Sequence, residues 1–285
     1  MLEPQKVARP VEQFFLACSM KRQALVLLAC TAFYPLVRSK ATGLDRFYLQ
    51  LITDFWGRIV VRPLTLNMRA YHFLNEQFGM DDIVKRRLKV ATLNDLNDPF
   101  ELFAVSLSDP AVRRAFRKMK EELSRTRGLL CFSRDWHNPV QWSHYADRHR
   151  GVCLGFDVSD ESVGPVTYSG KRIAARIEQL TAPRLLDPNT AISLLFTKFS
   201  HWSYEDEVRA FVTLEGRDPE IGLYFAEFSE RLRLREIIVG AASKLTRADI
   251  RCALGELAPT VAAWKARLAF SSFRIVRQRN ERLWA

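Results

Sequence analysis

The chain has 285 residues, of which 48% are hydrophobic and 26% charged, and it carries a formal net charge of +11. This composition excludes an intrinsically disordered chain, and the length suffices for one large domain with a substantial core. Five cysteines without regular spacing exclude a disulfide framework and predict a reducing, cytoplasmic location.

Residues 1–67 differ in composition from the rest of the chain. They hold nine Lys and Arg against four Asp and Glu, a net charge of +5, without strand alternation or a clean helical stripe. The apolar run 24–37 follows a Met-Lys-Arg sequence, as in a signal peptide, but falls short of the roughly 20 residues of a membrane span. Three interpretations stay open: a mainly helical or irregular extension, a translated upstream region with the functional start at Met68, or a secretion or membrane anchor. The unpaired cysteines disfavour the last, so no membrane partner is expected.

Residues 68–285 predict a single mixed α+β domain of short strands with flanking helices. In chain order, the sequence predicts a strand at 69–74, a helix at 80–87, a strand at 88–91, a turn at 94–101, an amphipathic helix at 109–127, a strand at 129–132, a helix at 139–148 and a strand at 152–156. Strand or turn segments at 162–168 and 172–180 follow, then a helix at 190–199, strands at 208–214 and 235–240, a helix at 247–268 opened by a capping box of Thr246 and Asp249, and a strand at 273–277.

The segment 129–157 concentrates residue types that carry chemistry. It holds three of the five histidines, two of the five cysteines and two of the six tryptophans. Cysteine and histidine suggest zinc, but the spacing of these five residues fits no zinc knuckle, and both cysteines lie in apolar runs. A nucleophile at Cys131 or Ser133 lacks a supporting GxSxG context. No metal is expected. The five residues considered as zinc ligands are Cys131, His137, His144, His149 and Cys153.

The helix expected at 109–127 is strongly basic. A non-catalytic module that binds nucleic acid or a protein partner could use its segment 111–127, whereas the simpler interpretation is a solvated helix face, partly neutralised by Glu121 and Glu122. The cations that would contact a nucleic acid are Arg113, Arg114, Arg117, Lys118 and Lys120.

A second cluster covers Trp202–Arg209. Glu205 and Glu207 lie two residues apart, so an extended backbone places them on one face. A carboxylate held there can act as a general base or stabilise a developing cation. Alternatively, Glu207 forms a structural salt bridge with Arg209.

Several motifs together resemble a known bacterial family, the domain of unknown function 2971. They are Tyr71-His72-Phe73, the NDPFE sequence at 97–101, LCFS at 130–133, WSHYA at 142–146, HRGVC at 149–153, WSYE at 202–205 with Glu207 and Arg209, and 237–240. The resemblance covers residues 68–245. Members begin close to the YHF strand, which favours the upstream-start interpretation of residues 1–67.

The same positions resemble, more loosely, the ADP-ribosyltransferase fold. This resemblance implies NAD as substrate, and either ADP-ribosyl transfer or NAD cleavage, in toxin or phage-defence contexts. His72 would hold the nicotinamide ribose hydroxyls, and Ser133 or Tyr145 would brace or stack on the nicotinamide. Glu207, or failing that Glu205, would stabilise the oxocarbenium-like ribosyl centre. The resemblance thus implies His72, Tyr145 and Glu207 as catalytic residues, and Ser133, Trp142 and Glu205 as cofactor-binding residues.

Overall fold

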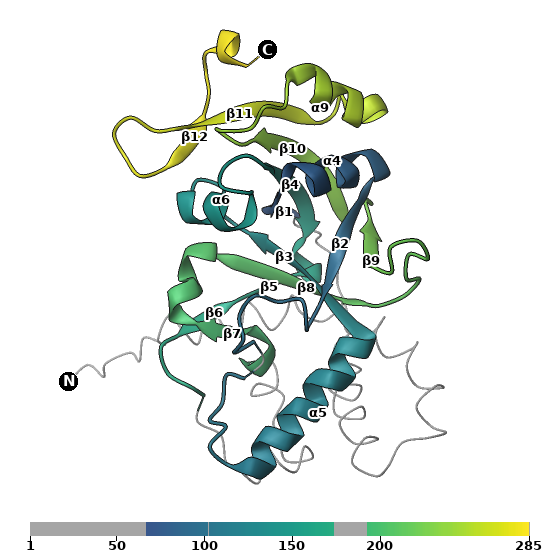
Figure 1. The fold of residues 1–285 in the computed structure, drawn as a ribbon, viewed down its shortest axis with the longest axis vertical. Helices are drawn as coiled ribbons and strands as arrows, with labels where there is room; N and C mark the ends of the chain where they lie inside the picture. The colour runs from purple at the N-terminus through teal and green to yellow at the C-terminus, as the bar shows by residue number, and fades with distance from the viewer. Residues whose placement is uncertain (1–66, 102, 174–192, 285) are drawn as a thin grey trace, which may run out of the picture.

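The computed structural model describes residues 67–101, 103–173 and 193–284. The expectations for residues 1–66, for most of the segment 172–180 and for the start of the helix at 190–199 lie outside the described residues. Within them the protein is a mixed α and β structure built on one large, curled sheet with few helices (Figure 1).

The large sheet has ten strands and is mostly antiparallel. Eight strands follow the order β12-β11-β10-β4-β1-β3-β2-β9, while β8 pairs with β3 and β5 pairs with β8. Only β10 and β11 pair in parallel within this sheet, and β6 and β7 form a separate parallel pair. The bounds are β1 (Asn67–Leu74), β2 (Arg87–Thr92), β3 (Arg127–Ser133), β4 (Val152–Ser159), β5 (Gly164–Pro165), β6 (Thr167–Ser169), β7 (Thr197–Phe199), β8 (Glu207–Thr213), β9 (Tyr224–Glu227), β10 (Leu232–Val239), β11 (Ala262–Leu268) and β12 (Ile275–Arg277).

Short polar residues begin the α-helices. The side chain of the residue before each helix accepts a backbone N–H of the first turn, which satisfies a donor that the helix itself cannot. The helices are α4 (Glu76–Lys85), α5 (Pro110–Thr126), α6 (Pro139–Tyr145) and α9 (Arg247–Leu254), with short 3₁₀-helices η1 (Asp160–Ser162), η3 (Ser200–Glu205), η4 (Gly255–Leu257) and η5 (Glu281–Leu283). Among the described helices, none combines the length and the apolar character that crossing a membrane requires.

The side chains of β4 pack into hydrophobic clusters on both faces of the sheet. In β4, Leu154 and Phe156 pack into the main core, whereas Cys153 points to the opposite face and joins a second cluster with Trp142. Successive side chains of a strand point to opposite faces, so β4 is buried on both sides. It therefore forms the centre of the sheet, between β1 and β10.

Two of the expected helices need correction. The helix expected at 247–268 has its predicted capping box but ends at Leu254, where Gly255 takes φ 49°, and Ala262–Leu268 is strand β11 instead. The helix expected at 190–199 gives way to strand β7 at Thr197. The short helix expected at 80–87 begins earlier, at Glu76, and β9 was not expected at all. The other strands confirm the expectations to within a few residues.

Candidate functional site

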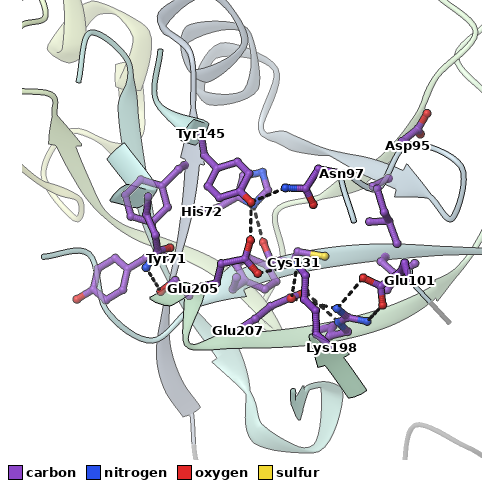
Figure 2. Close-up of a pocket in the computed structure, with 18 of the residues that line it drawn as sticks. Tyr71, His72, Asp95, Asn97, Glu101, Cys131, Tyr145, Lys198, Glu205 and Glu207 are labelled. Carbon is purple, nitrogen blue, oxygen red and sulfur yellow. Dashed lines mark hydrogen bonds and ion pairs between the residues drawn. The ribbon is translucent and has the colours of Figure 1, made fainter. Parts of the chain in front are cut away.

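A cavity of about 230 Å³ opens where strands β1, β2, β3 and β8 meet the loop 93–101. Tyr145, at the end of α6, and Glu205, at the end of η3, complete its wall (Figure 2). The residues that line it are Tyr71, His72, Phe73, Lys89, Ala91, Asp95, Leu96, Asn97, Glu101, Leu129, Cys131, Phe132, Ser133, Gln141, Tyr145, Lys198, Glu205, Glu207 and Arg209.

The register of β3 and β8 determines which side chains face the cavity. Ser133 pairs with Glu207 and Cys131 pairs with Arg209, so the polar residues of both strands share one face. Val208 between them points into the main core. Strand β1 pairs with β3 at one position, Tyr71 with Ser133. Beyond this pair the two strands are not hydrogen-bonded to each other, and residues of both line the cavity.

Arg209 anchors the base of the site. Its side chain is 1% exposed, and its guanidinium donates to both carboxylate oxygens of Glu101, at 2.6 and 3.2 Å, and to both oxygens of Glu207, at 2.9 and 3.0 Å. This confirms the structural salt bridge between Glu207 and Arg209 that the sequence allowed. Burial makes such charges costly unless they are paired, so the ion pair of Arg209 with Glu101 holds β8 to the loop that carries Glu101.

Lys198 links the two carboxylates that the sequence singled out. Its Nζ lies 2.6 Å from Glu205 Oε2 and 3.3 Å from Glu207 Oε2, and all three side chains are nearly fully buried. The hydroxyl of Tyr145 donates to Glu205 Oε1, and Asn97 Nδ2 lies 2.5 Å from the same hydroxyl. The result is a continuous chain of hydrogen bonds from the buried arginine to the exposed amide of Asn97, visible in Figure 2.

The two carboxylates differ in proton affinity. Burial raises the pKa of Glu205, and its contacts with Lys198 and Tyr145 offset this only in part. Burial also favours a higher pKa for Glu207, but Arg209 and Lys198 together outweigh it and hold that pKa below its usual range. Glu207 is thus a committed anion whose oxygens are occupied, whereas Glu205 is the stronger base.

His72 lies half-buried in the wall formed by β1. Its Nδ1 is 2.8 Å from the carbonyl oxygen of Cys131, and its ring meets Phe132 edge-on. Burial lowers the pKa of the ring, so it is neutral at neutral pH. A carbonyl only accepts hydrogen bonds, so Nδ1 carries the proton and Nε2 is left as an acceptor.

Ser133 is committed to the loop that follows β3. Its hydroxyl donates to the carbonyl of Asp135 at 2.9 Å and accepts from Gln141 Nε2 at 3.0 Å. Gln141 also donates to the carbonyl of Tyr204 at 3.0 Å, which ties α6 to η3. Ser133 therefore fixes the segments that present Tyr145 and Glu205.

The structure brings five of the six predicted site residues to one cavity: His72, Ser133, Tyr145, Glu205 and Glu207. Trp142 is the correction. It is fully buried, its Nε1 donates to the carbonyl of Trp136 at 2.6 Å, and it packs edge-on against Phe73. It belongs to the second core cluster and does not line the cavity, whereas Gln141 and Tyr145, four residues apart on α6, do.

Lys198 and Glu101 are functional-site residues that the sequence did not identify as such. Glu101 belongs to a motif that was singled out, whereas Lys198 fell in an expected helix. The five cysteines and histidines weighed for zinc are dispersed: His137 stacks on Trp136, His144 is exposed, and Cys153 is buried in the second cluster. Within the described ranges, no three His, Cys, Asp or Glu side chains come together as a metal site would require.

The basic helix α5 lies on the outside of the protein (Figure 1). Val112 and Phe116 are its buried residues, and its basic face is mostly exposed. Some of these cations have contacts within the protein. Arg113 donates to the carbonyls of Leu107 and Ser108, and Lys120 lies over the ring of Phe103.

Residues 141–210 match the family model of a protein of unknown function (DUF2971). No curated protein and no solved structure matches the chain. The matched segment begins in α6 and ends in β8, so it contains Tyr145, Lys198 and the two carboxylates Glu205 and Glu207. The match confirms, over residues 141–210, the resemblance to this family that the sequence motifs indicate.

Proposed function

We propose that the cavity binds the nicotinamide ribose end of NAD and cleaves its N-glycosidic bond, passing the ADP-ribosyl group to an acceptor or to water. The observation that carries this proposal is the contact between Tyr145 and Glu205. It places a carboxylate of raised pKa under a tyrosine hydroxyl, in the same cavity that His72 lines. A base held beside polar groups in a partly dry site suits this chemistry.

The charge of the cavity supports a cationic ligand. Three buried carboxylates face two buried cations, which leaves one negative charge, and the nicotinamide ring of NAD is positive. The buried groups are Glu101, Glu205, Glu207, Lys198 and Arg209. When the C–N bond breaks, its electron pair neutralises the nicotinamide and the positive charge moves to the ribose. A fixed negative charge nearby favours that change.

We assign the reacting carboxylate to Glu205 and not to Glu207. Both oxygens of Glu207 accept from the Arg209 guanidinium, and one also faces Lys198. Glu205 faces one cation, Lys198, and its Oε1 accepts from the neutral hydroxyl of Tyr145, which a substrate can displace more easily than a guanidinium. Glu205 would oppose the ribosyl cation and take the proton of the attacking hydroxyl. The unprotonated Nε2 of His72 would accept a hydrogen bond from a ribose hydroxyl.

The volume limits how NAD would lie. Pockets that enclose a whole drug-sized ligand measure about 300–1,000 Å³. At about 230 Å³, this cavity has room for the nicotinamide riboside end, and the adenosine end would lie outside it. The exposed side chains of Asn97 and Lys89 lie at its opening, where a pyrophosphate would pass.

Release of nicotinamide from NAD by the full chain tests the proposal. We expect Glu205→Gln to lower kcat by about 10²–10³-fold, because the amide can neither oppose the cation nor accept a proton. Tyr145→Phe should lower it less, and Glu215→Gln, at an exposed position beyond β8, should leave it unchanged. Equal rates for the wild-type protein and Glu205→Gln would refute the assignment. If the wild-type protein releases no nicotinamide but binds an oligonucleotide with an affinity that falls steeply as salt rises, a binding module on α5 replaces the enzyme.

A further inference from the structure

The hairpin of β11 and β12 exposes large apolar side chains at its tip. Leu268 is 65% exposed, Phe270 94% and Phe273 98%. The backbone N–H of Ala269 donates to the carbonyl of Arg274 at 2.9 Å, which closes the turn and fixes the two rings on a short loop. In Figure 1 this loop stands out from the edge of the large sheet. Two almost fully exposed phenylalanine side chains on one projecting loop indicate an interaction site.

Positive charge predominates around this tip, where Asp135 pairs with one of the arginines, Arg274, at 3.5 Å. Residues 262–280 contain five Lys and Arg and no Asp or Glu. The guanidinium of Arg267 lies 4.4 Å from the ring centre of Phe270, and that of Arg277 lies 5.1 Å from the ring of Trp264 in the stem. The apolar side chains thus lie at the tip of the hairpin, and the cations follow along both strands away from the tip.

We propose that this hairpin docks on an anionic lipid surface, with the rings of Phe270 and Phe273 in the interface and the arginines on the lipid phosphates. The sequence of groups along the hairpin supports a membrane, because apolar side chains enter below the headgroups while cations stay at their level. Single-stranded nucleic acid is less suited, since its phosphates would have to meet cations that lie behind the protruding rings. The expectation of no membrane partner concerned an anchor within residues 1–67, and docking by this hairpin does not require such an anchor.

The proposal is independent of the reaction in the cavity. Its test is sedimentation of the full chain with vesicles of phosphatidylcholine and phosphatidylserine, compared with vesicles of phosphatidylcholine alone. We expect binding to the mixed vesicles, and a loss of at least about tenfold in partition for the double variant Phe270→Ser, Phe273→Ser. The double variant Arg274→Gln, Arg277→Gln should lose about fivefold per charge and depend less on salt.

Phe78→Ser is the matched control, since Phe78 is 57% exposed but lies in α4, outside the hairpin. It should bind the mixed vesicles like the wild-type protein. Because the substituted side chains are exposed, all variants should keep the wild-type melting temperature. Undiminished binding by the phenylalanine variant, no binding by the wild-type protein, or equal binding to neutral and anionic vesicles would each overturn the proposal. Loss of oligonucleotide binding in that variant, without vesicle binding by the wild-type protein, would assign the hairpin to nucleic acid instead.

Discussion

Replacing Arg209 with methionine should destabilise the protein more than any other single change at the cavity. The guanidinium makes five hydrogen bonds, two to each of Glu101 and Glu207 and one to the carbonyl of Leu195. Methionine fills much of the same volume but leaves two buried carboxylates without their cation. Breaking a buried pair in this way costs about 3–5 kcal/mol. For a domain of this size, that corresponds to a melting temperature lower by roughly 6–20 °C.

The loss should depend on pH in a defined direction. In the wild-type protein the pKa of Glu207 is lowered, so its contribution is present above the unfolded value of about 4.3 and is lost as pH falls through the lowered pKa. In Arg209→Met, Glu207 is buried without that cation, and its pKa should rise. It then takes up a proton on folding, so the difference in stability should shrink as pH falls from about 8 towards about 5.

Urea denaturation at the two pH values measures both effects. The control is Arg233→Met, which removes an exposed arginine that pairs with Glu230 at 3.1 Å and should cost less than about 1 kcal/mol at either pH. A loss below about 1 kcal/mol for Arg209→Met, or a loss that does not change with pH, would refute the reasoning that the guanidinium compensates two buried charges.

Three further predictions concern other parts of the molecule. Lys198→Met removes the cation that faces Glu205, so the pKa of Glu205 should rise and the acid limb of the NAD-turnover profile should move up by about one pH unit or more; an unmoved limb would contradict this. Burial raises the pKa of Asp82 to about 7, and its Oδ2 has no partner. The wild-type protein should therefore lose stability as pH rises from about 4 to about 7, whereas Asp82→Asn has no such carboxylate and should become more stable relative to it, as urea midpoints would show. A gain that is the same at both pH values would count against it. In Gly240→Ala the new Cβ would lie 2.2 Å from the carbonyl oxygen of His149, so the melting temperature should fall sharply. In Gly170→Ala the nearest contact of the new Cβ is at 3.5 Å, so this variant should keep the melting temperature of the wild-type protein.

The strands that carry the site could be predicted because their signal is local. In β3, β4 and β8, short apolar runs are bounded by polar or turn residues, as is typical of strands buried on both faces. Residues 256–268 misled the prediction because alanine and leucine also suit a helix. The parallel pairing of β11 with β10, which places Ala262 opposite Glu236, decides their structure. That contact joins different parts of the chain, and periodicity does not report it.

The same distinction holds for the site. The pairing of Glu207 with Arg209 follows from two positions on one strand face. The expectation that an extended backbone places Glu205 and Glu207 on one face was wrong, because Glu205 ends η3 and Asp206 is left-handed with φ 43°. Both carboxylates nevertheless line the cavity. Lys198 could not be found, because the parallel pairing of β7 with β6 sets its position. Which carboxylate remains available depends on Lys198 and Arg209 together. From the sequence we placed Glu207 first as the reacting carboxylate, whereas the chemistry proposed above uses Glu205.

The central place of β4 in the sheet has a consequence for synthesis on the ribosome. Every residue that lines the cavity has been made once residue 209 is reached, yet one side of β4 waits for β10, at residues 232–239. Until then an apolar strand has a free edge, and such an edge is a template for pairing between chains. A nascent or truncated chain that ends before β10 should therefore aggregate, although it contains all of the residues proposed for the chemistry.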